Sequence, residues 1–112
     1  MTDYERFQRS FNKYRKLFGL SGYKVYFKKE AISDSFADIM VDVTGKCATV
    51  RFNDALSAKD KAFRNPSGEG KHEAIHLLVG KLSEVAQSRY ISQREVVESE
   101  EELVRKLEEL IK

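Results

Sequence analysis

The sequence lacks several residue types that would point to particular classes of protein. It has no tryptophan, and it has one proline, one cysteine and two histidines among 112 residues. Because Cys47 has no second cysteine to pair with, no disulfide can form within the chain, and a reducing compartment is favoured. No apolar run approaches the length of a membrane span, and the first residues lack the apolar core of a signal peptide. We therefore expect a cytoplasmic protein without a membrane partner.

A strong excess of charge of either sign is also missing. The 20 basic and 18 acidic residues give a formal net charge of +2, which by itself implies neither nucleic acid nor an acidic membrane as a partner. Charged residues make up 34% and hydrophobic residues 41% of the chain, as in an ordinary globular domain. The length is enough for one core, and we predict a single domain over residues 1–112.

The first apolar pattern has the period of a helix. Thr2 and Glu5 form a capping box at its start, and Gly19 is placed to end it. The stripe between them is aromatic and is typical of a core: Tyr4, Phe7, Phe11, Tyr14 and Phe18. The opposite face is basic, and such a face is more often a solvated surface than a nucleic-acid site: Arg6, Arg9, Lys13, Arg15 and Lys16.

Alternating apolar residues then predict three strands. They occupy about residues 23–28, 37–43 and 48–52, with turn signals at Asp34-Ser35 and at Thr44-Gly45-Lys46. The second of these turns has the form of a hairpin connection. Because successive strands are joined by short links, we expect a mostly antiparallel meander.

Two longer helices follow a stretch that is rich in turn formers. Ser57 could cap a short helical turn, and residues 65–70 are Asn-Pro-Ser-Gly-Glu-Gly. A helix begins within or just after this stretch and runs to about Gln87. Ser92 with Glu95 makes a second capping box before a C-terminal amphipathic helix. The predicted fold class is α+β, with an N-terminal helix, a three-stranded mostly antiparallel sheet, a central helix and a C-terminal helix.

Both histidines lie in the central helix, four residues apart, with a glutamate directly after the first. Residues i and i+4 share one face of a helix, so His72 and His76 can bind one zinc ion, and Glu73 can reach a water held on it. Random placement would give this HExxH pattern in roughly 0.2% of cases. The alternative is an exposed or capped histidine pair. The motif is surrounded by apolar residues on nearly all sides, which predicts a buried helix and disfavours that alternative. These residues are Ala74, Ile75, Leu77, Leu78, Val79, Leu82, Val85 and Ala86.

A catalytic zinc typically has three protein ligands, and the sequence narrows the choice of the third. No third histidine exists and no aspartate follows the motif, while Glu84 lies too far along the same helix. Glutamates of the last helix remain, between residues 95 and 102. There Glu100 projects into the centre of the apolar stripe and Glu101 to its edge, so helical phase leaves both open. Otherwise these glutamates pair at the surface with basic residues at i+4, and Asp54 is the nearest carboxylate upstream.

This layout resembles the minimal gluzincin-type zinc metallopeptidases, especially the small zincin-like proteins encoded by phages and prophages. One part of the resemblance is residues 72–78, His-Glu-Ala-Ile-His-Leu-Leu. The other is residues 101–107, Glu-Glu-Leu-Val-Arg-Lys-Leu, which is similar to the family's glutamate followed by a Leu-Val pair and a further leucine. The chain departs from the family at Gly68 and Gly70, where we expect an irregular entry to the motif helix.

The resemblance implies zinc-dependent hydrolysis of peptide bonds. One zinc ion per chain would be held by His72, His76 and Glu101, which the resemblance favours over Glu100, and Glu73 would be the general base. The implied substrate is a peptide or a protein.

Two further roles are open around this site. Arg89 and Tyr90, just after the motif helix, are candidate oxyanion donors, although both could be ordinary loop residues. An extended substrate could pair with an exposed strand edge, for which the third strand is the predicted position.

Two other classes of function compete with the peptidase. One is a zinc-binding module without turnover, such as a phage regulator that binds a host protein. The intact Glu73 argues against it, because a purely structural zinc site has no need of a base there. The other is a nucleic-acid binder that uses the basic face of the first helix, and the small net charge argues against that class.

Overall fold

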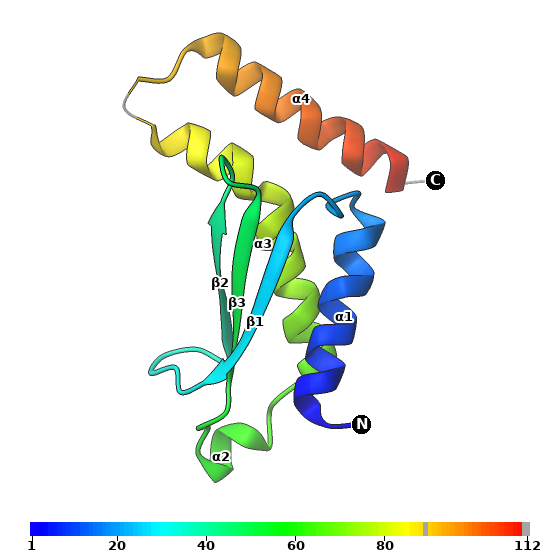
Figure 1. Cartoon of the computed structure of the whole chain (residues 1–112), viewed down its shortest axis with the longest axis vertical. Coiled ribbons are helices and arrows are strands. Elements are labelled where there is room, and N and C mark those ends of the chain that lie inside the picture. Colours follow the sequence, from blue (N-terminus) through cyan, green and yellow to red (C-terminus); the bar gives the residue numbers. More distant parts are fainter. Residues whose placement is uncertain (89, 111–112) are drawn as a thin grey trace.

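The predicted helices and strands all occur in the structure, a computed structural model that describes residues 1–88 and 90–110 (Figure 1). The helices are α1 (Asp3–Leu17), α2 (Ala58–Lys61), α3 (Pro66–Gln87) and α4 (Gln93–Leu110). The strands are β1 (Lys24–Glu30), β2 (Ala37–Asp42) and β3 (Cys47–Asn53). The α+β class is confirmed, and the predicted bounds are met to within a few residues.

Local capping explains where the helices begin and end. Thr2 Oγ1 accepts a hydrogen bond from the Glu5 N–H at 3.1 Å, and the Glu5 carboxylate accepts from Thr2 in return, which completes the predicted capping box. Gly19 has φ +72°, a left-handed conformation that glycine adopts without steric cost after the end of α1. At the start of α4, Ser92 Oγ accepts from the Glu95 N–H at 3.2 Å.

The sheet is mixed and has the order β1-β3-β2, so the predicted antiparallel meander is wrong. β2 and β3 form the expected antiparallel hairpin, but β1 pairs with β3 in parallel. Alternating apolar residues indicate which face of a strand is buried, not which strand lies beside it. β3 is therefore central, with both edges paired, and the predicted substrate edge on the third strand is wrong as well. The exposed edge nearest α3 belongs to β2.

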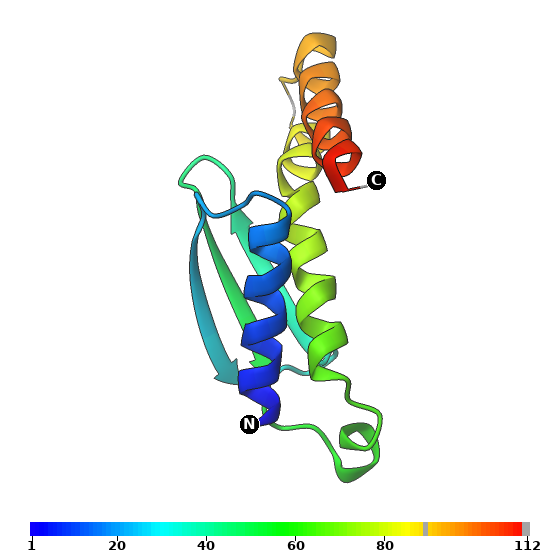
Figure 2. The same cartoon turned by 90° about the vertical axis from the view of Figure 1, so that its right-hand side faces the viewer.

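The core lies between the sheet and two helices. α1 and α3 lie side by side on one face of the sheet (Figure 2). The largest fully buried side chains come from α1, β3 and α3: Phe7, Phe11, Val50 and Leu77. α4 packs against the C-terminal part of α3 and stands beyond the end of the sheet (Figures 1 and 2). None of the helices in the described ranges is long and apolar enough to cross a membrane.

The entry to α3 is regular, which corrects the irregular entry predicted from its glycines. Asn65 caps the helix by accepting a hydrogen bond from the Gly68 N–H at 3.1 Å, and Pro66 occupies the first turn, where its missing N–H is tolerated. A Cβ at Gly70 would lie 2.5 Å from the Phe7 carbonyl oxygen. Glycine is therefore required at this position because the backbones of α1 and α3 approach closely.

α3 is less buried than its sequence predicts. Its buried residues are Gly70, Glu73, Ala74 and Leu77, whereas Ile75 is 41% exposed and both histidines are exposed. The prediction of a helix covered on nearly all sides is wrong, because α1 and the small sheet cover one side only and α4 covers only the C-terminal part. The cost of burying an unpartnered histidine therefore gives no argument for a metal.

Candidate metal centre

The two histidines meet on one face of α3. Their Nε2 atoms lie 3.2 Å apart, and their ring centroids are separated by 4.8 Å. Both side chains are exposed, so they are open to an ion from solvent. The i, i+4 spacing of the sequence thus produces the predicted convergence of the rings.

The distance between the ring nitrogens fits two ligands of one zinc ion. At Zn–N distances of about 2.0–2.1 Å, tetrahedral geometry separates two nitrogen ligands by about 3.3 Å. A carboxylate oxygen of Glu73 completes a group in which one ligand atom from each residue lies within 4.8 Å of the others. Across residues 1–88 and 90–110, this is the one group of three or more such side chains that the geometry allows to share an ion.

Glu73 points inward, whereas both histidines of the motif are exposed. Only 4% of its surface is exposed. Burial raises the pKa of Glu73 to about 7, and the negative charges of Asp38 and Glu69 raise it in the same direction. A carboxylate with this pKa can both take up and release a proton near neutral pH, which is the property required of a general acid and base.

A buried ion pair holds the first turns of α3 against the sheet. The Arg64 guanidinium pairs with Glu69 at 3.0 Å and donates to the carbonyl oxygens of Asn53 at 2.6 Å and Phe36 at 2.7 Å. It also lies 3.7 Å from the centroid of the Phe52 ring. This arginine joins the end of β3, the lead into β2 and the turn that precedes His72. Sequence reasoning missed Arg64, because most of its partners are backbone carbonyls, which leave no sequence signal.

Two hollows flank the histidines along β2. One, of about 530 Å³, reaches His72 and Glu73 and is lined by Phe36 and Phe63. The other, of about 670 Å³, reaches His76 and lies between β2, the start of β3 and the C-terminal half of α3. The first hollow touches β2 at Ala37 and the second at residues 39–42, so together they accompany β2 past both histidines and leave room for an extended chain.

The two glutamates predicted as third ligand lie away from this group. Lys81 is about 180° around α3 from His72, at about 100° per residue, and it pairs with Glu102 of α4 at 2.6 Å. α4 therefore packs on the side of α3 that faces away from the histidines. Glu101 is exposed and faces Arg105 at 3.7 Å, and Glu100 is exposed as well. The structure brings His72, Glu73 and His76 together and leaves both α4 carboxylates outside.

The weaker candidates are also distant from the group or outside the description. Tyr90 is 86% exposed, and Arg89 lies outside the described residues. Asp54, the upstream alternative, is exposed at the end of β3 and does not join the histidines.

Comparisons with known protein families, with curated proteins and with solved structures gave no match to this chain.

Proposed function

We propose that this protein is a zinc-dependent peptidase whose ion is held by His72 and His76, one ion per chain. The observation that carries the proposal is the placement of a buried carboxylate with a raised pKa beside two exposed ring nitrogens 3.2 Å apart. A zinc ion bound there supplies a Lewis acid for a carbonyl oxygen and lowers the pKa of a bound water to about 7.

The residues of the chain supply the proton transfers. Glu73 takes a proton from the attacking water and returns it to the leaving amine, for which a pKa of about 7 is well matched. Its buried position keeps competing water away from the carboxylate. Glu69 and Arg64 hold the preceding turn and so fix the direction of Glu73.

The proposed substrate is an extended peptide that adds as a strand to the edge of β2. Backbone groups along Ala37–Asp42 have one paired edge, toward β3, and one edge free for a new partner. The two hollows beside this edge would receive alternate side chains of the peptide, and the apolar wall at Phe36 and Phe63 adjoins Glu73.

The test separates zinc binding from turnover. We expect close to one zinc per chain in the parent by elemental analysis, and loss of most of it in His72→Ala and in His76→Ala. Glu73→Gln is nearly isosteric and cannot accept a proton, so it should keep its zinc while hydrolysis of a peptide library falls by roughly 10²-fold or more. A parent that holds no zinc even after zinc addition would exclude the proposal.

A zinc-binding module without turnover is the second candidate, and one observation favours it. The Glu73 carboxylate lies close enough to both histidines to serve as the third ligand itself. In that case Glu73→Gln would lose zinc together with the histidine variants, and the parent would bind zinc without hydrolysing any peptide.

A further inference from the structure

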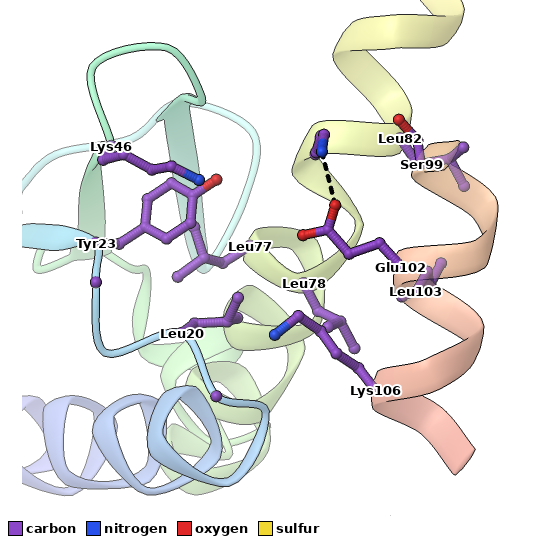
Figure 3. A pocket seen from close by; sticks show the side chains of 13 residues that line it. Leu20, Tyr23, Lys46, Leu77, Leu78, Leu82, Ser99, Glu102, Leu103 and Lys106 are labelled. Carbon is purple, nitrogen blue, oxygen red and sulfur yellow. Dashed lines mark hydrogen bonds and ion pairs between the residues drawn. The ribbon is translucent and has the colours of Figure 1, made fainter. Parts of the chain in front are cut away.

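A further cavity lies on the other side of α3, between α3, α4 and the loop that leads from α1 to β1 (Figure 3). Its volume is about 270 Å³. Pockets for drug-sized ligands have about 300–1,000 Å³, so this cavity suits a smaller molecule. Five leucines give it an apolar lining: Leu20, Leu77, Leu78, Leu82 and Leu103.

Positive side chains outnumber negative ones in the lining of the cavity. Lys81 is paired with Glu102 at 2.6 Å, the contact dashed in Figure 3. Lys106 donates to the carbonyl oxygen of Phe18 at 3.2 Å, which supplies no counter-charge. Lys46 lies 5.1 Å from the centroid of the Tyr23 ring. Within residues 1–88 and 90–110, neither Lys46 nor Lys106 forms an ion pair. Both act on Glu102 from a longer distance, since its pKa is lowered first by Lys81 and then by Lys106 and Lys46. Three lysines and one glutamate line the cavity, so its lining carries a net charge of +2.

Tyr23 adds a neutral donor beside Lys46. The residue is 8% exposed, and the Lys46 side chain points toward its ring, with the ammonium 5.1 Å from the ring centroid (Figure 3). Burial, followed by the negative charge of Glu102, raises the pKa of Tyr23 above its ordinary value. The hydroxyl therefore keeps its proton at neutral pH and can donate it in a hydrogen bond.

We propose that this cavity binds a small carboxylate that carries an apolar body. The carboxylate lies between the Lys46 ammonium and the Tyr23 hydroxyl, with Lys106 as the second positive charge, and the apolar body covers the leucines. An inorganic anion would leave the leucines uncovered, and an amine would be repelled by the lysines. Because Lys46 follows β2 and Lys106 belongs to α4, the bound molecule ties α4 to the rest of the fold.

The test uses hexanoate and N-acetyl-leucine, which represent a free short-chain acid and an apolar C-terminal residue of a peptide. Binding is measured by titration calorimetry on the full-length His72→Ala variant in EDTA, so that a carboxylate on zinc cannot mimic the signal. We expect saturable binding at one site per chain for at least one probe, and the stronger probe identifies the source of the ligand. Acetate and hexylamine are the controls for the apolar body and for the negative charge.

Matched variants locate the site. Lys46→Gln should weaken binding by at least about tenfold, because a charge-assisted hydrogen bond is lost. Tyr23→Phe removes only the hydroxyl and should weaken binding by a few-fold. Lys28→Gln makes the same change of charge on an exposed strand residue and should bind like the reference protein. Thermal melts confirm that each variant is folded. Absence of saturable binding, equal binding of hexylamine, or unchanged affinity in Lys46→Gln would overturn the proposal.

Discussion

Glu73 is, among the described residues, the acidic side chain that the fold buries most completely. Burial of a carboxylate without a positive partner favours its protonated form, which explains the direction of its pKa shift. An enzyme can use a carboxyl group with a raised pKa. The same burial makes the folded protein less stable when Glu73 ionises. The stability of the zinc-free protein should therefore record the titration of Glu73.

The predicted pH dependence has a definite sign. Between its ordinary pKa of 4.5 and about 7, Glu73 holds a proton in the folded chain that the unfolded chain has released. Its contribution to stability is complete below about pH 4.5 and is lost as the pH rises through about 7. Glu73→Gln does not titrate. Relative to this variant, the parent should lose up to about 2–3 kcal/mol of unfolding free energy between pH 4.5 and 8.

Urea unfolding at several pH values, with EDTA present, measures this difference. The two proteins differ only at residue 73, so the comparison with Glu73→Gln isolates the contribution of this carboxylate. A constant difference between parent and variant over this range would show that the carboxylate is not desolvated as described.

At the residue scale, the sequence predicted which side chains of the motif come together but not how exposed each of them is. The spacing of His72 and His76 is sufficient to bring their rings together, because helical geometry is local. Exposure is not local. It depends on how much of α3 the small sheet and α1 cover, so the expected burial of both histidines was wrong, whereas Glu73 is buried. The bonds of Arg64 to backbone carbonyls could not be predicted, because every residue carries such a carbonyl.

At the scale of elements, the packing of α1 on α3 depends on one glycine. We expect Gly70→Ala to destabilise the protein by about 1–3 kcal/mol, although alanine is the better helix former, because its Cβ would overlap the backbone of α1. Gly80→Ala, on the same helix, is the control. There the Cβ would meet a methyl group of Val41 at 3.2 Å, which can shift, so the change should stay within about 1 kcal/mol. Thermal unfolding of both variants measures the difference. Equal melting temperatures would contradict the close approach of the α1 and α3 backbones at Gly70.

The alternation of apolar residues predicted where the strands lie in the sequence but not their order in the sheet. Each predicted strand exists, and the turn at residues 44–46 correctly predicted the hairpin of β2 and β3. A signal for the central strand was present in the charges. β3 carries one charged residue, whereas β1 carries four, and edge strands tolerate charge better than a central strand does. Weighing charge as well as period would have favoured β3 as the central strand.

The position of α4 governs the choice of a third zinc ligand. In the described arrangement, we expect Glu101→Gln and Glu100→Gln to bind zinc like the parent, because both carboxylates lie on a helix that faces away from the histidines. Zinc titration of both variants against the parent tests this expectation. A loss confined to Glu101→Gln would support the assignment from the resemblance, and it would require α4 to leave its contact at Lys81 when zinc binds.

At the scale of the whole molecule, the small net charge hides a separation of charge. α4 carries seven glutamates and three basic residues, a net charge of −4, so the rest of the chain has a formal charge of +6. Part of this excess lines a groove of about 460 Å³ between α1 and the start of α3, and none of the described residues that line this groove is acidic. Its basic residues are Arg6, Arg9, Lys13 and Lys71. Net charge is a property of the whole sequence. It therefore gives little argument against an anionic partner on the α1 face.

The same separation of α4 from the core gives the last prediction. The core joins α1, the sheet and α3, whereas α4 contributes Leu110 to its margin and otherwise contacts mainly α3. A chain that ends after residue 88 should therefore unfold cooperatively with a melting temperature lowered by several degrees, because Leu78 and Leu82 lose their cover while the core is kept. It should still bind zinc through His72 and His76. It should lose the carboxylate probe that the full-length protein binds, hexanoate or N-acetyl-leucine, since Lys106 is removed and the cavity has lost one wall. Zinc titration and calorimetry on this chain check both expectations. Retained folding with loss of zinc would mean that α4 supplies a ligand, whereas retained binding of that probe would contradict the cavity between α3 and α4.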